Sequence, residues 1–231
     1  MQNHTKISLE EIENAIVARD KKDAEIDREN RIELVKKGLR LIQPKKIIKI
    51  DTGKVIGVPN VVNLIKKEIT DSDTIIAVEG ESGCGKSSTA KMLAEEHETG
   101  IISASDIFRY LTYSKLKDQS KKIAEIIASL EYKLNNDRIY LFEDQTNITK
   151  DLHSQLHTHE IDLNVAHVAS RSQAQVIGFL SGEILRLSGH VDKKIIFEGR
   201  AFTLDFLPCD LRVVLFADVD VRAKRRMEQE R

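Results

Sequence analysis

One segment of the chain constrains its fold more than any other. Residues 74–78, with the sequence Thr-Ile-Ile-Ala-Val, form a short apolar run, as expected of a strand buried on both faces of a parallel sheet. The next residues, Gly80-Glu-Ser-Gly-Cys-Gly-Lys-Ser87, match the pattern GxxxxGK(S/T), and a helix is predicted from Lys86 to Glu96. A buried strand, a glycine-rich turn and a helix in this order predict an α/β fold.

The glycine-rich turn contains the groups that hold phosphate. Its glycines let the backbone come close to an anion with N–H groups turned inward, and the positive end of the following helix dipole adds to the attraction. Lys86 can reach the β and γ phosphates, and the Ser87 hydroxyl can bind Mg²⁺. We therefore predict a site for ATP and Mg²⁺. The predicted nucleotide-binding residues are Gly80, Glu81, Ser82, Gly83, Cys84, Gly85, Lys86, Ser87 and Ser88.

The rest of the chain after this helix alternates between strand-like and helix-like runs. Further buried strands are predicted at Ile101-Ile102, Lys194–Phe197 and Leu211–Phe216, and a strand-like piece at Arg138–Phe142. Helices separate them, which predicts a three-layer α/β fold of the P-loop NTPase type with a mainly parallel sheet. The predicted helices are Ile107–Lys117, Lys121–Leu134, Ile161–Leu187 and Val221–Arg231.

Residues 1–70 have a different pattern from residues 71–231. Ser8-Leu-Glu-Glu11 predicts a capping box that opens a helix, and the highly charged stretch Arg19–Arg31 is either a solvated helix face or a break between two helices. Lys45–Ile50 is a candidate short strand. We expect a helical N-terminal extension, residues 1–70, that packs on a main domain, residues 71–231. A dedicated partner-binding module is the alternative.

Composition and charge limit the possible partners. The 231 residues are 41% hydrophobic and 32% charged, as in soluble globular proteins, and their formal net charge is −1. No global field therefore attracts nucleic acid or an anionic membrane, and no run approaches the roughly 18 apolar residues of a membrane span. The two cysteines give no disulfide framework. We predict a cytoplasmic protein that binds neither nucleic acid nor membrane.

The segment after the glycine-rich turn and its helix resembles the acceptor-site segment of nucleoside monophosphate kinases. Ile102-Ser-Ala-Ser-Asp-Ile-Phe-Arg109 is similar to ISTGDMLR of adenylate kinases and LDTGAMYR of cytidylate kinases, and Ser103 follows Lys86 by 17 residues, as in both families. The resemblance implies that Arg109 holds the phosphate of the acceptor monophosphate, with Ser103 and Asp106 beside it. A guanidinium fork suits a phosphate that must be gripped and oriented.

Later segments resemble cytidylate kinases in particular. Arg138–Thr146 is similar to the small insert of that family. Asn164-Val-Ala-His-Val-Ala-Ser170 is similar to its EVxxxAS segment, which implies that Ser170 contacts the monophosphate.

The segment Ile195–Pro208 resembles VADGRDIGTVVFP of the same family. This resemblance aligns Arg200 with a phosphate-binding arginine and Glu198 with the carboxylate that ends the third strand. A carboxylate there can hold a water on Mg²⁺, so Ser87 and Glu198 are the expected metal residues.

Taken together, the resemblance implies transfer of the γ-phosphoryl group of ATP to CMP or dCMP. The catalytic residues would be Lys86, Arg109 and Arg200, with an acceptor-side insert at about 113–160 and a sheet order of 2-3-1-4. Family members continue into an arginine-bearing lid and a fifth strand, so we expect both to be missing here, with an unpaired sheet edge beside Leu211–Phe216 and weak transfer. The expected substrate-binding residues are Ser103, Asp106, Arg109, Ser170 and Arg200.

Two departures from the family pattern leave alternatives open. The aspartate after Gly-Arg is Ala201 here, and the arginine expected early in the long helix is Ile177. One alternative is therefore a nucleotide-binding module with a degenerate acceptor site that does not catalyse transfer. Another is an ABC-type ATPase, because Leu180-Ser-Gly-Glu183 is similar to LSGGQ, although Ile196-Phe-Glu-Gly199 stands where a strand ending in Asp-Glu-Pro is expected.

Overall fold

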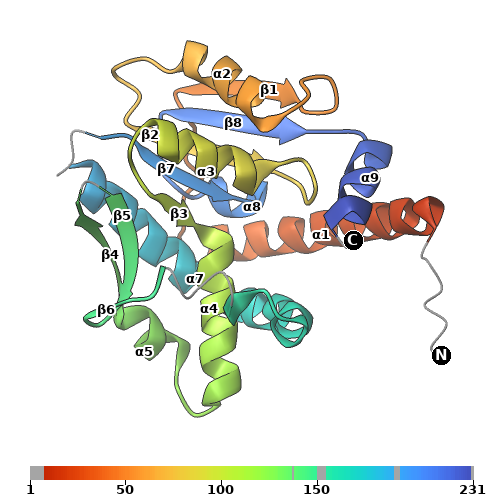
Figure 1. Ribbon diagram of the computed structural model, residues 1–231. Coiled ribbons are helices and arrows are strands. Elements are labelled where there is room, and N and C mark those ends of the chain that lie inside the picture. The colour runs from red at the N-terminus through yellow and green to blue at the C-terminus, as the bar shows by residue number, and fades with distance from the viewer. Residues whose placement is uncertain (1–7, 137, 150–154, 190–192, 230–231) are drawn as a thin grey trace.

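A five-stranded sheet forms the centre of the computed structural model, which describes residues 8–136, 138–149, 155–189 and 193–229. Neighbouring strands are parallel, in the order β1-β8-β2-β7-β3 (Figure 1). The strands are β1 (Lys46–Asp51), β2 (Ile75–Gly80), β3 (Ile101–Ser103), β7 (Ile195–Gly199) and β8 (Leu211–Phe216).

The inner strands are apolar on both faces, so helices cover the sheet on two sides. Along β2, Ile75 and Ala77 face one hydrophobic core, while Ile76 and Val78 face another. This alternation follows from the two-residue period of a strand. The predicted three-layer α/β fold is therefore confirmed. Helices α2 (Val58–Glu68) and α3 (Lys86–Glu96) cover one face, and α4 (Ala104–Lys117), α7 (His159–Ser188) and α8 (Ala201–Leu204) cover the other.

The four strands predicted from residue 74 onward lie in the predicted order. β3, β7, β2 and β8 follow one another across the sheet, which is the order 2-3-1-4. The predicted unpaired edge beside β8 is wrong, because β1 pairs with that strand from Lys46 opposite Leu211 to Asp51 opposite Phe216. The N-terminal segment thus supplies a strand of alternating exposure whose backbone N–H and C=O groups pair with those of β8.

This pairing joins the two expected parts of the chain. Val61, Val62 and Ile65 of α2 lie within residues 1–70, yet they share one core with Ile76 and Val213 of the sheet. We therefore expect β1 and α2 to unfold together with the later strands. The division at residue 70 otherwise stays a prediction.

The N-terminal extension contains one long helix. α1 (Leu9–Lys36) has 28 residues and runs without a break through the charged stretch Arg19–Arg31. It begins with the predicted capping box, in which Glu11 N–H donates to Ser8 Oγ at 3.2 Å. Although α1 is long, no helix among the described residues is both long and apolar enough to cross a membrane.

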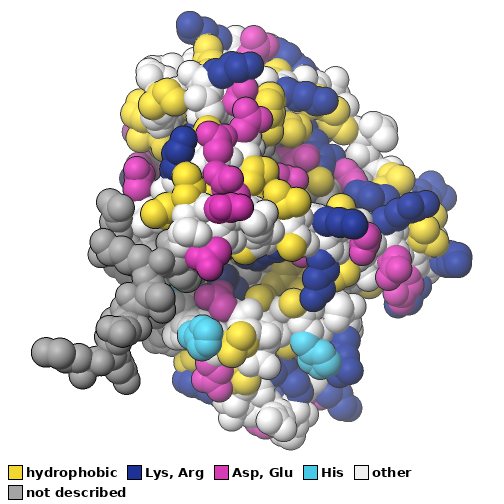
Figure 2. Space-filling view, turned by 90° about the vertical axis from the view of Figure 1, so that its right-hand side faces the viewer, with side chains coloured by type: hydrophobic (Ala, Val, Ile, Leu, Met, Phe, Trp, Pro, Cys, Tyr) yellow, Lys and Arg dark blue, Asp and Glu magenta, His cyan; other side chains and the backbone are white. Residues whose placement is uncertain are grey.

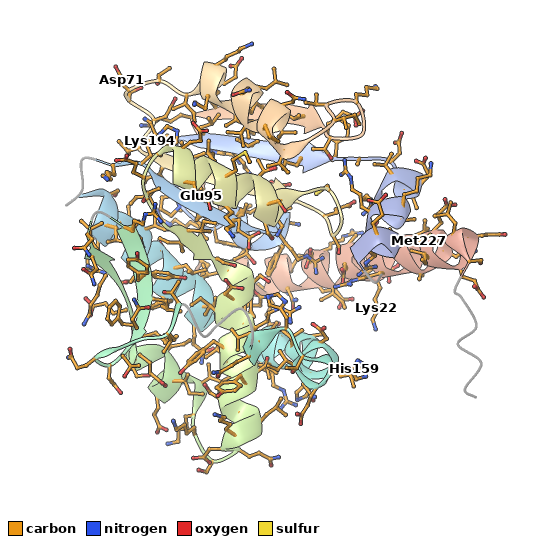
Figure 3. The ribbon with its side chains drawn as sticks, in the orientation of Figure 1. Lys22, Asp71, Glu95, His159, Lys194 and Met227 are labelled. Atoms are coloured by element: carbon orange, nitrogen blue, oxygen red, sulfur yellow. The ribbon has the colours of Figure 1, made fainter. Side chains whose placement is uncertain are left out.

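The first turns of α1 pack on the last described helix, α9 (Val219–Gln229). Ile12 and Ile16 form a small core with Ala223. Figure 3 shows Met227 of α9 at the same crossing, against α1. The two ends of the described chain therefore lie side by side.

A small antiparallel sheet lies in the region of the predicted insert. β4 (Leu130–Asn135), β5 (Arg138–Glu143) and β6 (Thr146–Asn147) form this sheet, and α5 (Ile123–Ala128) precedes it. The strand predicted at Arg138–Phe142 is confirmed, whereas the second half of the helix predicted at Lys121–Leu134 is wrong. Leu130 and Tyr132 alternate with less buried residues, so pairing with β5 outweighs local helix propensity.

We predict that Ile65→Ala destabilises the whole sheet and not only its N-terminal part. Ile65 is fully buried on α2, and the substitution leaves a cavity in a core shared with the later strands. The free energy of unfolding should fall by about 2–5 kcal/mol, in one cooperative denaturant transition followed by circular dichroism. Leu64→Ala, at an exposed position of the same helix, should change it by less than about 1 kcal/mol. Separate transitions for residues 1–70 and 71–231 would contradict the shared core.

Candidate active site

The carboxyl ends of the parallel strands meet at one edge of the sheet. β2 ends at the glycine-rich loop, β3 at Ser103, and β7 immediately before Arg200. In open parallel sheets, ligands bind outside this edge. Figure 2 looks onto this side of the molecule and shows a hollow in its middle, with Lys and Arg side chains at the border.

The loop between β2 and α3 has a conformation that only glycine allows at several positions. Gly83 and Gly85 have φ values of 86° and 88°, in the left-handed region. A Cβ atom on Gly80 would lie 2.4 Å from Cys84 Sγ and 2.8 Å from Leu215 O. Among the described residues, no side chain caps the start of α3. The first N–H groups of this helix are therefore available to an anion, which fits the phosphates of a nucleotide.

Cys84 and Arg222 hold the outer turn of the loop. Cys84 Sγ donates to Glu81 O at 2.8 Å, and burial raises the pKa of this thiol, so it stays protonated. Arg222, on α9, lies with Nη1 2.9 Å from Glu81 Oε2. A Cβ atom on Gly83 would lie 3.2 Å from Arg222 Cβ, so the loop packs closely on α9.

Glu198, near the end of β7, joins the loop to the predicted acceptor segment. Its buried carboxylate accepts hydrogen bonds from Lys86 Nζ, from Ser87 Oγ at 3.3 Å and from Ser103 Oγ at 2.7 Å. Ser103 Oγ also accepts the N–H of Asp106 at 3.2 Å, which caps α4. The structure thus brings predicted donor-side and acceptor-side residues together around one carboxylate.

The oxygen atoms of Glu198 and Ser87 suit a magnesium ion. Mg²⁺ prefers oxygen ligands, and in nucleotide sites it uses one or two carboxylates together with phosphates and waters. Within the described part of the chain, no group of three or more His, Cys, Asp or Glu side chains could hold a metal by itself. Any Mg²⁺ at Glu198 and Ser87 would therefore depend on phosphate and water for its other ligands.

Arg109 lies on α4 and contacts the first turn of α7 and the segment before it. Its Nη1 donates to Leu156 O at 2.8 Å, and its Nη2 lies 2.6 Å from Asp162 Oδ1. The arginine side chain is mostly buried, whereas Asp162 is about half exposed. Ser170, farther along α7, donates from Oγ to His167 O at 2.9 Å, so its hydroxyl is used within its own helix and not in the Glu198 cluster.

Arg200 follows β7 and contacts α1. Its Nη1 lies 3.2 Å from Asp23 Oδ2 and its Nη2 lies 3.1 Å from Asp27 Oδ2, with half of the arginine side chain exposed. Asp20, on the same face of α1, lies 2.5 Å from Arg222 Nη2. We call these three carboxylates the acidic stripe. Burial raises the pKa of Asp27, while the charge of Arg200 opposes that shift.

Comparison with known proteins gives a family for most of the chain. A family model described as cytidylate kinase matches residues 76–231. The chain belongs to the cytidylate kinase family. A cytidylate kinase of Mycoplasmopsis synoviae strain 53 is 28% identical over 160 residues, which are 67% of this chain and 70% of that protein. One of Mesomycoplasma hyopneumoniae strain 232 is 30% identical over 164 residues, 67% of this chain and 66% of that protein. The chain thus spans about two thirds of the length of these curated relatives.

The resemblance to cytidylate kinases predicted from sequence motifs is therefore confirmed. The cytidylate kinase match begins at Ile76, so it contains the loop, Arg109, Glu198 and Arg200 but neither α1 nor β1. The contacts of Asp23 and Asp27 with Arg200 thus join a segment outside the match to one inside it. Sequence reasoning missed these carboxylates, because their spacing is also that of an ordinary solvated helix face.

We predict that Asp23→Asn with Asp27→Asn makes Arg200 more available to phosphate. The amides keep the shape of α1 and remove the two charges that hold the guanidinium. Because the pairs are partly exposed, each is worth at most about 1 kcal/mol, and the affinity for CMP measured by calorimetry should rise about two- to fivefold. Glu25→Gln with Glu29→Gln removes two exposed carboxylates of the same helix and serves as the control. An equal gain in both variants would point to net charge instead of the contact with Arg200.

Proposed function

We propose that this chain transfers the γ-phosphoryl group of ATP to a nucleoside monophosphate, with CMP or dCMP as acceptor. The observation that carries the proposal is the cluster around Glu198, since it links Lys86 and Ser87 of the phosphate loop to Ser103 of the acceptor segment. Membership of the cytidylate kinase family and relatives named cytidylate kinase support the same acceptor.

ATP would be held by the phosphate loop, residues 80–88. The loop N–H groups and the start of α3 would face the phosphates, and Lys86 would leave Glu198 to contact them. Mg²⁺ bound near Ser87 and Glu198 would neutralise charge on the phosphates. Glu198 would then have a cation beside it both without ATP (Lys86) and with ATP (Mg²⁺), as a buried carboxylate requires.

The acceptor phosphate would be held by Arg109 and Arg200. Ser103, Asp106 and Ser170 would complete this side of the site. A monophosphate oxygen is already an anion, so its attack needs no strong general base. The side chains would therefore act by aligning the two nucleotides and by neutralising charge.

The nucleoside of the acceptor would be recognised differently from the family pattern. Ile177, on α7, is buried in a hydrophobic core, and Ala201 has only a methyl side chain, while its carbonyl accepts Arg212 Nη2 at 3.1 Å. Neither side chain can hydrogen-bond a base or a sugar. The choice of CMP or dCMP therefore rests on family membership. We place the reaction in the cytoplasm, where both nucleotide substrates are available.

A second candidate function is nucleotide binding without transfer. The ion pairs of Arg200 with Asp23 and Asp27 favour it, because they occupy the guanidinium that the acceptor would need. An ABC-type ATPase has less support. Leu180 is buried inside α7, and Glu183 accepts the N–H of Tyr132 at 2.6 Å, so these residues contribute to packing.

A coupled assay for ADP separates these functions. The full chain would be incubated with ATP and Mg²⁺, alone and with CMP, dCMP, UMP or AMP. ADP formed only with CMP or dCMP would support the proposed transfer, and ADP formed without an acceptor would indicate an ATPase. ATP binding by calorimetry without ADP in any mixture would favour the binding module.

We predict that Lys86→Ala raises the dissociation constant for ATP about 10- to 100-fold, since it removes a charge-assisted phosphate contact. Calorimetry with ATP and Mg²⁺ measures this change. Lys91→Ala removes the same charge from an exposed position of α3 and should leave ATP binding unchanged. A thermal melt accompanies both variants, because Lys86 also neutralises buried Glu198. Unchanged affinity in folded Lys86→Ala would refute the assignment.

We predict that Arg109→Ala and Arg200→Ala weaken CMP binding and leave ATP binding nearly intact. Each loses a charge-assisted contact with the acceptor phosphate, which should cost about 1.5–3 kcal/mol. Calorimetry with each nucleotide separately reports the two affinities, and Arg138→Ala, at an exposed position of β5, is the control. If either variant lost ATP affinity instead, its place on the acceptor side would be wrong.

A further inference from the structure

Two side chains from distant parts of the chain hold the outer side of the phosphate loop. Thr52 directly follows β1, and Arg225 lies on α9. Thr52 Oγ1 donates to Cys84 O at 3.0 Å, and Arg225 Nη1 donates to Gly83 O at 3.1 Å. The same guanidinium also contacts Thr52 Oγ1 at 3.0 Å and Thr52 O at 2.6 Å, so the two side chains form one unit.

These contacts act on the direction of the loop N–H groups. A trans peptide is planar, with its C=O and N–H on opposite sides, and the described residues contain no cis peptide. Holding Cys84 O on the outer side therefore turns Gly85 N–H to the inner side. Holding Gly83 O does the same for Cys84 N–H, which already donates to Glu81 O at 3.4 Å. The hydrogen bond from Thr52 to Cys84 O therefore orients the N–H of Gly85, which can donate to a ligand.

The loop needs such support because it is rich in glycine. Gly83 and Gly85 have many accessible backbone conformations, and fixing them costs conformational entropy. The hydrogen bonds to the carbonyls of Gly83 and Cys84 restrict these conformations before a ligand binds, so less entropy is lost on binding and the affinity is higher. Thr52 is only 3% exposed, so solvent does not weaken its contacts.

Thr52 also has contacts that belong to the sheet. Its N–H donates to Phe216 O at 2.8 Å, and its Oγ1 lies 3.2 Å from the same oxygen. A hydroxyl has one proton, so it donates to Cys84 O or to Phe216 O at any moment. Cys84 O is the nearer acceptor, and Phe216 O already has the backbone N–H, so the geometry favours the loop.

We infer that Thr52, acting with Arg225, is a positioning residue for the phosphate loop. The inference rests on the proposed binding of ATP phosphates at that loop. The N-terminal segment would then contribute to nucleotide binding, because β1 pairs with β8 at the edge of the sheet and so places Thr52 behind the loop. Residue 52 lies outside residues 76–231 and Arg225 lies inside them, so only the contribution of Thr52 is not part of the family match.

The test compares Thr52→Val and Thr52→Ser with the unaltered chain. Valine keeps the shape and removes the hydroxyl, whereas serine retains it. Calorimetry with ATP·Mg²⁺ and with tripolyphosphate measures loop binding with and without the nucleoside. The Kd for both ligands should rise about 5- to 10-fold in Thr52→Val and stay within about twofold in Thr52→Ser.

Thr112→Val is the matched control. Thr112 is also buried, and its hydroxyl donates to Phe108 O at 2.8 Å within α4, away from the loop. This variant should lower Tm without changing the Kd for either ligand.

Arg225→Lys is a second test of the pair Thr52 and Arg225. Lysine keeps the positive charge but lacks the guanidinium fork that bridges Gly83 O and Thr52. This variant should raise both Kd values about as much as Thr52→Val does.

The two possible failures give different results. If the unaltered chain binds both ligands and folded Thr52→Val binds them equally well, the inference is overturned and Thr52 is a strand-end contact only. If the unaltered chain binds neither ligand, the proposed nucleotide site itself is wrong, and the inference fails with it. Should Thr52→Val not fold, the Kd values of Arg225→Lys decide in the same way.

Discussion

The buried carboxylate of Glu198 must be neutralised, and the candidate site is arranged around that requirement. An unpaired charge at the end of an apolar strand would be strongly destabilising. Lys86 and Ser87 at the start of α3 and Ser103 at the start of α4 supply the compensating contacts. The same electrostatic requirement therefore fixes both helices relative to β7. It also keeps the phosphate loop and the acceptor segment within reach of one another.

The N-terminal segment acts on this site through two kinds of contact. Thr52 is buried and donates a hydrogen bond to the loop carbonyl of Cys84, so this contact is part of the folded framework. Asp23 and Asp27 of the acidic stripe make partly exposed ion pairs with Arg200, and such pairs are weak enough for another anion to displace them. A phosphate could therefore replace the stripe at Arg200, whereas it could not replace Thr52 behind the loop.

The two arginines proposed for the acceptor are both held before a ligand binds. Arg109 is fixed by Leu156 O and Asp162 near the start of α7, and Arg200 by carboxylates of α1. Holding a long side chain in place reduces the rotamer entropy lost on binding, although each existing ion pair must also be given up. The balance of these two effects would set the affinity for the proposed acceptor.

The sequence by itself determined the features that depend on short segments. The apolar run at 74–78, the glycine-rich loop and the capping box at Ser8 each have a local signature, and the strand order followed from the family resemblance that the motifs revealed. Only the tertiary structure decided the partner of β1, the strand at Leu130–Asn135 and the carboxylates that hold Arg200. Asp27 and Arg200 are 173 residues apart, and their contact depends on how α1 packs across the fold. Spacing along a chain predicts the period of a helix or strand, but not which distant surface will cover it.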